Sequence, residues 1–133
     1  KSEGNAIYLI DDAATIRKKV MKAVTDSGPT QPNSEKPEAI ANLFTMLKIV
    51  SSADTYDYFN EKYNNCEIRY GDMKKQLAED INNSCAPIRE RILDIRSNEE
   101  YLAKVARQGA EKARESAAKT LNEVRQIIGF RPY

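Results

Sequence analysis

The fold class follows most directly from residues 98–128, which read NEEYLAKVARQGAEKARESAAKTLNEVRQII. Apolar residues recur here at spacings of three and four, which places one apolar stripe along a continuous helix. Asn98 suits the N-cap of this helix and Gly129 suits its end. At a rise of about 1.5 Å per residue the helix would be roughly 46 Å long, which exceeds the width of a domain of this size. We therefore expect a long helix against which shorter helices pack.

The apolar stripe of this helix changes in size along its length. Small residues occupy the middle, so the backbone of a packing partner can approach closely there, while bulkier side chains stand at both ends. The stripe consists of Leu102, Val105, Ala106, Gly109, Ala110, Ala113, Ala117, Leu121, Val124 and Ile128.

Composition limits the class of protein. The 133 residues, 41% of them hydrophobic, suffice for one domain with a modest core. The 21 Lys and Arg residues nearly cancel the 20 Asp and Glu residues, so net charge does not by itself indicate a nucleic-acid partner. The sequence has no apolar run long enough for a membrane span. It also has no His, which removes the commonest general base and a common metal ligand, and we expect no metal site.

The two cysteines, Cys66 and Cys85, stand without a second pair at metal-binding spacing. We expect both to be reduced residues that take part in packing, and a disulfide between them is the alternative.

The opening of the chain differs from the rest. Lys1-Ser2-Glu3-Gly4-Asn5 is polar and contains glycine, and residues 6–10 form an apolar run. We expect a flexible loop that leads into a short extended segment. The chain does not begin with Met, which suggests a fragment of a longer protein; a frayed terminus is the simpler interpretation of these first residues.

The remaining sequence predicts helices joined by short polar connections. Asp12 caps a helix over Ala13–Thr25, and Pro37 begins another that continues to Val50. Ser52 or Asp54 caps a third helix. Its aromatic residues at helical spacing are assigned to the core rather than to base stacking: Tyr56, Phe59 and Tyr63.

From Gly71 onward the pattern is again helical as far as Ile95. Pro87 lacks an amide hydrogen, so we expect it to kink this helix or to divide it near Ser84. With the long helix at the end, the sequence predicts an all-α bundle of about five helices.

Several motifs resemble one family. Lys1-Ser2-Glu3-Gly4-Asn5 is similar to the end of the Lys-Met-Ser-Lys-Ser signature loop of class I aminoacyl-tRNA synthetases. The segment Ala23-Val24-Thr25-Asp26-Ser27, after an Asp-Asp helix start, resembles bacterial-type tryptophanyl-tRNA synthetases more than the related tyrosyl enzymes. Residues 70–78 resemble the family's Gly-x-x-Lys-x-x-Leu-Ala segment, and residues 109–113 resemble part of its C-terminal helix.

The resemblance implies a division of the chain and a role for its first residues. Residues 1–12 would be the end of the signature loop and the connection from a Rossmann catalytic domain, and residues 13–133 a helical anticodon-binding domain. Lys1 and Ser2 match the last two signature residues, so by resemblance they are the catalytic and ATP-binding residues. A flexible ammonium there can stabilise negative charge that develops on the pyrophosphate.

The resemblance also implies the activity and partners of the whole enzyme. In this family the intact enzyme joins tryptophan to its tRNA through an adenylate made from ATP with Mg²⁺. By resemblance we expect a cytoplasmic homodimer without membrane association. Because nearly the whole Rossmann domain is missing, we expect the fragment alone to be inactive and to hold no cofactor.

The predicted tRNA contacts are basic residues of the last two helices. They are Lys74, Lys75, Arg89, Arg107, Lys112 and Arg114. The hypothesis requires that at least two of them share an exposed surface. A helical wheel places Arg107, Arg114 and Arg125 near one meridian of the long helix, where they would contact phosphate or form salt bridges with nearby acids.

Alternatives from other classes remain open. The chain could belong to a tyrosyl-tRNA synthetase, or be a helical protein-interaction module that binds partners through the small-residue seam of the long helix and has no RNA role. A catalytic carboxylate pair among Asp54, Asp57 and Glu61 has little support, because these residues suit a solvated helix face.

Overall fold

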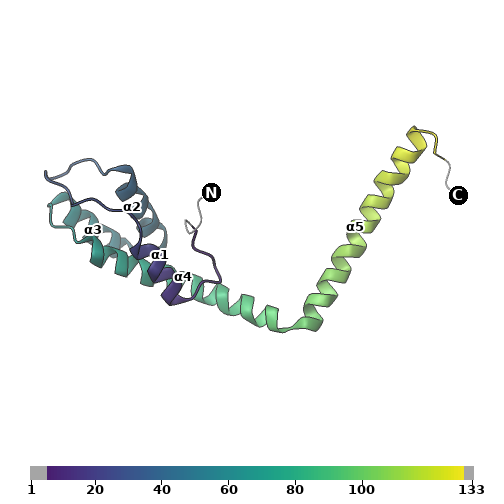
Figure 1. Ribbon diagram of the computed structural model, residues 1–133, viewed down its shortest axis with the longest axis horizontal. Helices are drawn as coiled ribbons and strands as arrows, with labels where there is room; N and C mark the ends of the chain where they lie inside the picture. The colour runs from purple at the N-terminus through teal and green to yellow at the C-terminus, as the bar shows by residue number, and fades with distance from the viewer. Residues whose placement is uncertain (1–5, 131–133) are drawn as a thin grey trace. The chain divides into compact units, whose positions relative to one another are not determined.

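The structure, a computed structural model, describes residues 6–130, and all regular secondary structure within that range is helical (Figure 1). Its helices are α1 (Ala13–Met21), α2 (Glu38–Val50), α3 (Ala53–Asn64), α4 (Tyr70–Ser97) and α5 (Glu99–Ile127). The predicted all-α fold of five helices with a long C-terminal helix is confirmed. None of the described helices combines the length and apolar character that crossing a membrane requires.

The chain forms two compact units that divide between Glu90 and Arg91, inside α4. Each unit is therefore described by itself. The boundary predicted after residue 12 concerns function and stays a prediction, although α1 does begin at Ala13.

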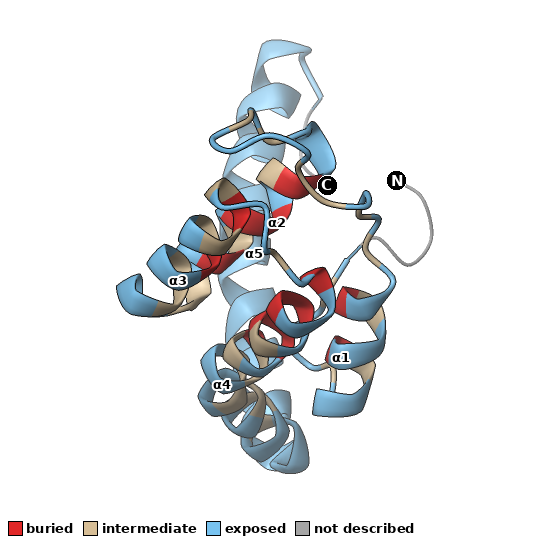
Figure 2. Ribbon diagram, turned by 90° about the vertical axis from the view of Figure 1, so that its left-hand side faces the viewer, coloured by how far each residue is buried: buried red, intermediate tan, exposed pale blue. Residues whose placement is uncertain are grey.

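The first unit has one core, to which α1, α2, α3 and the first half of α4 contribute buried side chains (Figure 2). The predicted aromatic packing is confirmed, because Phe44 lies edge to face against Tyr56 at 6.0 Å and against Tyr63 at 5.8 Å between ring centroids. Burying each large side chain contributes about 1.5–3 kcal/mol. The core consists of Ile16, Val20, Ile40, Leu43, Phe44, Leu47, Phe59, Tyr63, Tyr70, Met73, Leu77, Ala78 and Ile81.

Side-chain caps fix where three helices begin, as the sequence predicts. The Asp12 carboxylate accepts a hydrogen bond from the Thr15 amide at 2.7 Å, and Asn98 caps α5 through the Tyr101 amide at 2.9 Å. For α3 the cap is Ser52, whose hydroxyl accepts from the Thr55 amide at 3.2 Å.

The end of α5 is closed by a glycine, also as predicted. Gly129 has φ +78°, and its amide donates to the Gln126 carbonyl at 3.3 Å. The Phe130 amide donates to the Arg125 carbonyl at 2.8 Å, which completes a Schellman motif.

The end of α3 has the same motif with a cysteine in the glycine position. Cys66 has φ +60°, its amide donates to the Tyr63 carbonyl at 3.0 Å, and the Glu67 amide donates to the Lys62 carbonyl at 2.8 Å. Cys66 is exposed, so its predicted packing role is wrong, whereas Cys85 packs against the core. Both thiols are free.

Of the two outcomes predicted for Pro87, a kink or a division of the helix near Ser84, the division is wrong and the kink stays a prediction. α4 continues from Tyr70 to Ser97 with Pro87 inside it. Proline removes the hydrogen bond to the carbonyl of Asn83, four residues earlier. Both Asn83 and Pro87 are exposed, so water can satisfy that carbonyl and the helix can continue.

The expectation that shorter helices pack against the α5 stripe stays a prediction, because α5 belongs to the second unit and is described by itself. α5 has no buried residue, and Leu102, Val105, Leu121 and Val124 are 39–48% exposed (Figure 2). Local interactions support the helix: the Asn98 cap, acidic residues in the first turn, Arg125 in the last turn and several alanines.

The apolar run before α1 turns rather than continuing as an extended segment. Leu9 and Ile10 form a turn, in which the Asp11 amide donates to the Tyr8 carbonyl at 2.9 Å. Ile7 packs against the core of the first unit. The run therefore anchors the entry into α1.

The left-handed conformation of Cys66 leads to a stability prediction. A side chain at this φ costs about 1 kcal/mol that glycine does not incur, and the exposed thiol loses no packing. We expect Cys66→Gly to raise the free energy of unfolding by about 1 kcal/mol, measured by urea denaturation.

The neighbouring Asn65, at φ −90°, serves as the matched control. Asn65→Gly should not stabilise the chain, because a right-handed residue gains nothing from glycine there. A loss of stability in Cys66→Gly would contradict the interpretation of the α3 end.

Candidate nucleic-acid interface

Lys1 and Ser2, the predicted catalytic and ATP-binding residues, lie outside the described residues. Among the described residues, an ion pair holds the segment before α1 against that helix. The Lys19 ammonium donates to the Asp11 carboxylate at 2.5 Å and lies 4.7 Å from the centre of the Tyr8 ring. The side-chain hydrogen bond from Lys19, together with the Tyr8 amide, holds the pKa of Asp11 below its ordinary value.

Arg89, a predicted tRNA contact, fastens this same segment to α4. Its guanidinium donates to the Asp11 carbonyl at 2.7 Å and to the Asn82 side chain at 3.0 Å. The side chain is partly buried. Arg89 thus positions the residues that follow the predicted signature loop, and its contact with tRNA stays a prediction.

Lys74, another predicted tRNA contact, is buried with 7% of its surface exposed. Its ammonium donates to the Ala23 carbonyl at 2.6 Å and to the Thr25 hydroxyl at 3.1 Å. These bonds tie the segment after α1 to α4. Because the ammonium faces the protein interior, we do not keep Lys74 among the proposed tRNA contacts.

Lys75 lies at the surface, beside a groove of about 490 Å³ between α1 and α4. It forms a long ion pair with Asp72 at 3.4 Å between two half-exposed side chains. Arg17 and Asn82 line the same groove, as does the carboxylate of Glu79. The sequence analysis did not include Arg17 among the candidate site residues. Only its spacing of four residues from Ala13 indicates that both lie on the face of α1 that lines the groove.

Arg107, Lys112 and Arg114 are all exposed on α5. Arg107 and Arg114 lie seven residues apart, so they share one face at a separation of about 10 Å along the helix axis. These two residues meet the condition of a shared exposed surface. Lys112 lies on a different face.

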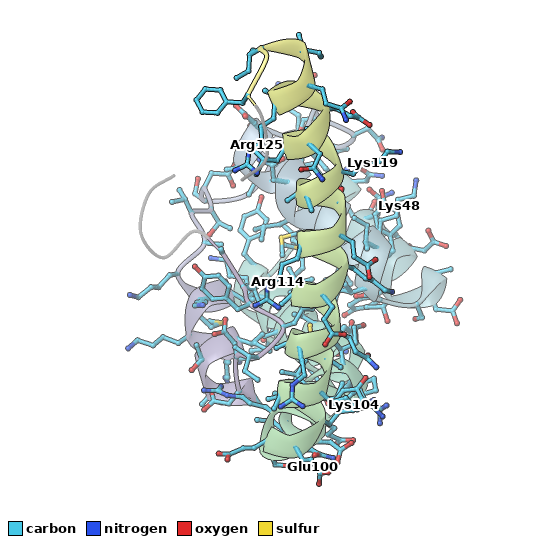
Figure 3. All side chains as sticks on the ribbon, turned by 90° about the vertical axis from the view of Figure 1, so that its right-hand side faces the viewer. Lys48, Glu100, Lys104, Arg114, Lys119 and Arg125 are labelled. Carbon is cyan, nitrogen blue, oxygen red and sulfur yellow. The ribbon has the colours of Figure 1, made fainter. Side chains whose placement is uncertain are left out.

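Arg125 extends this row, and Figure 3 shows Arg114 and Arg125 on the same side of α5, away from Lys119. Within residues 6–130 none of Arg107, Arg114 and Arg125 forms an ion pair. The alternative, that these three arginines form salt bridges with nearby acids, is therefore not supported within the described residues. We call them the arginine row.

The arginine row suits binding of polyanions. The described residues contain no group of three or more His, Cys, Asp or Glu side chains that could hold a metal ion. Arginines on a rigid helix present planar donors that match phosphate oxygens. An exposed row can therefore contact several phosphates without rearranging the fold.

Comparison with known sequences identifies the class of protein. The sequence model of the family described as tRNA synthetases class I (W and Y) matches residues 1–85. The chain belongs to this family.

Individual relatives narrow the comparison further. The chain is 68% identical over 131 residues to a tryptophan–tRNA ligase of Porphyromonas gingivalis, and the matched region covers 98% of the chain and 40% of that relative. It is 40% identical over 127 residues to a tryptophan–tRNA ligase of Listeria monocytogenes, with 95% and 37% covered. Tryptophan–tRNA ligase 1 of Streptomyces coelicolor is 35% identical over 127 residues, with 95% and 36% covered. The chain thus spans about two fifths of the length of these relatives.

The burial of Lys74 leads to a second prediction. Lys74→Met keeps the apolar stem but removes both hydrogen bonds, leaving the partly buried Ala23 carbonyl without its donor. We expect the free energy of unfolding to fall by about 1–3 kcal/mol, measured by urea denaturation.

Lys75→Met is the matched control, because the adjacent lysine is exposed and its ion pair is long. It should change the free energy of unfolding by less than about 0.5 kcal/mol. Equal stability of the two variants would contradict a structural role for the Lys74 ammonium.

Proposed function

We propose that this chain is the C-terminal, anticodon-binding part of a tryptophan–tRNA ligase. The observation that carries the proposal is the match of 98% of the chain to one tryptophan–tRNA ligase at 68% identity. The names of the three relatives favour tryptophan over tyrosine as the amino acid. The intact protein would activate tryptophan with ATP and Mg²⁺ and transfer it to tRNA, as a homodimer in the cytoplasm.

The first residues would belong to the catalytic half of that enzyme. Lys1 and Ser2 match the end of the signature loop, so their role is to contact ATP phosphates when the rest of the enzyme is present. The hydrogen bonds of Lys19 in α1 and Arg89 in α4 to Asp11 would then hold the segment that follows this loop against the helices. The fragment is proposed to be inactive by itself, since it spans only two fifths of its relatives.

The arginine row is the proposed tRNA-contacting surface. Arginine contacts to phosphate supply affinity that depends on salt, whereas base contacts supply sequence preference. Arg107 and Arg114 are exposed, share a face and are free of ion pairs with other described residues. Lys75, Arg89 and Lys112 remain candidates for further phosphate contacts.

A second candidate function is binding of a protein partner through α5. The supporting observation is its stripe of half-exposed apolar side chains, among them Leu102, Val105, Leu121 and Val124. Such a stripe is typical of a helix face that another protein surface covers. This candidate predicts tight protein binding that does not depend on the arginine row.

Substitution of the arginine row tests the tRNA proposal. Arg107→Ala and Arg114→Ala should each weaken binding to tryptophan tRNA. Each should reduce the slope of log affinity against log salt by about one, because one phosphate contact is lost. The measurement is fluorescence anisotropy with labelled tRNA over a salt series.

Lys119→Ala is the control, because Lys119 is a cation on the other side of the same helix (Figure 3). It should leave both the affinity and the salt slope nearly unchanged. If Arg107→Ala and Arg114→Ala behave like Lys119→Ala, the arginine row does not contact tRNA.

A further inference from the structure

A second groove of the first unit has a chemistry that the arginine row lacks. It encloses about 650 Å³ and is lined by residues from α3, from the connection to α4 and from the start of α4. This volume lies within the range of sites that hold small organic ligands. Its walls include Tyr58, Lys62, Glu67, Arg69 and Asp72.

Tyr58 gives the groove an aromatic wall. The side chain is 55% exposed, although it stands beside the core residue Phe59, which is 7% exposed. The two rings meet edge to face with their centroids 5.1 Å apart and their planes at 76°. The Lys62 ammonium lies over this ring, 6.0 Å from its centre, so a base would stack on the part of the Tyr58 ring that Lys62 leaves exposed. A tyrosine ring held against a buried ring provides such a stacking surface at low cost in conformational entropy.

Of the two cations that line the groove, one forms an ion pair and the other, Arg69, does not do so within the described residues. Lys62 donates to the Glu67 carboxylate at 2.7 Å, and this hydrogen bond raises the pKa of Lys62 and lowers that of Glu67. Asp72 pairs with Lys75 at 3.4 Å. The exposed Arg69 guanidinium takes part in no ion pair or side-chain hydrogen bond with residues 6–130.

We infer that this groove binds one unpaired nucleotide of an RNA, with its base stacked on Tyr58 and its phosphate against Arg69. The inference rests on the proposed function, because it names the part of tRNA that the first unit contacts. A base inside a duplex has both faces stacked on neighbours, so only an unpaired nucleotide offers a face to the Tyr58 ring. The Glu67 and Asp72 carboxylates disfavour a second phosphate and can accept hydrogen bonds from amino groups of a base.

The test uses the full 133-residue chain and a fluorescein-labelled single-stranded RNA pentanucleotide, with a duplex of the same sequence as comparison. The single strand should bind more tightly than the duplex. Tyr58→Ala should weaken its binding about tenfold, because base–aromatic stacking is lost, while Tyr58→Phe should keep the affinity. Arg69→Gln should reduce the salt slope by about one.

Tyr101→Ala is the control for Tyr58→Ala, because Tyr101 is a similarly exposed tyrosine, at 50%, on α5. It should leave pentanucleotide binding unchanged. Equal losses in Tyr58→Ala and Tyr58→Phe, no loss in Tyr58→Ala, or no binding of the pentanucleotide to the unmodified chain would each overturn the inference.

The same variants separate this inference from the proposed function. If tRNA binding depends on Arg107 and Arg114 but Tyr58→Ala does not weaken pentanucleotide binding, the groove inference fails and the proposed function stands. If pentanucleotide binding depends on Tyr58 while tryptophan tRNA does not bind, the groove inference stands and the proposed function fails.

Discussion

The Lys74 ammonium, buried in the first unit, carries the interaction on which the connection after α1 depends. Lys74 stands in α4 between the core residues Met73 and Leu77, and its ammonium donates to the Ala23 carbonyl and the Thr25 hydroxyl. Hydrogen bonds from a charged donor contribute about 1.5–3 kcal/mol, and here they offset the cost of removing an ammonium from water. These two hydrogen bonds fix the position of the segment that leads from α1 toward α2.

A second lysine performs a similar task at the end of that connection. Lys36 donates to the Asn60 side chain at 2.8 Å, and its ammonium lies 4.8 Å from the centre of the Phe44 ring and 4.6 Å from that of Tyr63. Burial lowers the pKa of Lys36. Two cations that a composition count would assign to solvent or nucleic acid are thus part of the packing. The cations left for a polyanion lie elsewhere, above all on α5.

Local features of the fold were predictable from the sequence because their causes are local. The caps at Asp12, Ser52 and Asn98 and the glycine end of α5 depend on a few adjacent residues, and all four are confirmed. The buried positions of α2 and of the first half of α4 follow from helical periodicity. Family resemblance added what periodicity lacks, namely the class of enzyme.

Features that depend on distant residues were not predictable. Lys74 lies seven residues before Ile81, on the apolar face of α4, so helical spacing is consistent with its burial. That its ammonium donates to the Ala23 carbonyl depends on a residue 51 positions away and could not be predicted. The continuity of α4 through Pro87 depends on solvent reaching the Asn83 carbonyl. For the candidate interface, helical spacing correctly predicted the shared face of Arg107 and Arg114 but not the groove beside Tyr58.

The most direct test of the account is binding of this chain to tryptophan tRNA and to the same tRNA with a substituted anticodon, across a salt series. An anticodon-binding part should prefer the native anticodon, and the preference should persist as salt rises, because base contacts do not depend on released counterions. Weak and equal binding to both tRNAs, lost at moderate salt, would contradict the account, since it would mean that the helices attract RNA only through charge.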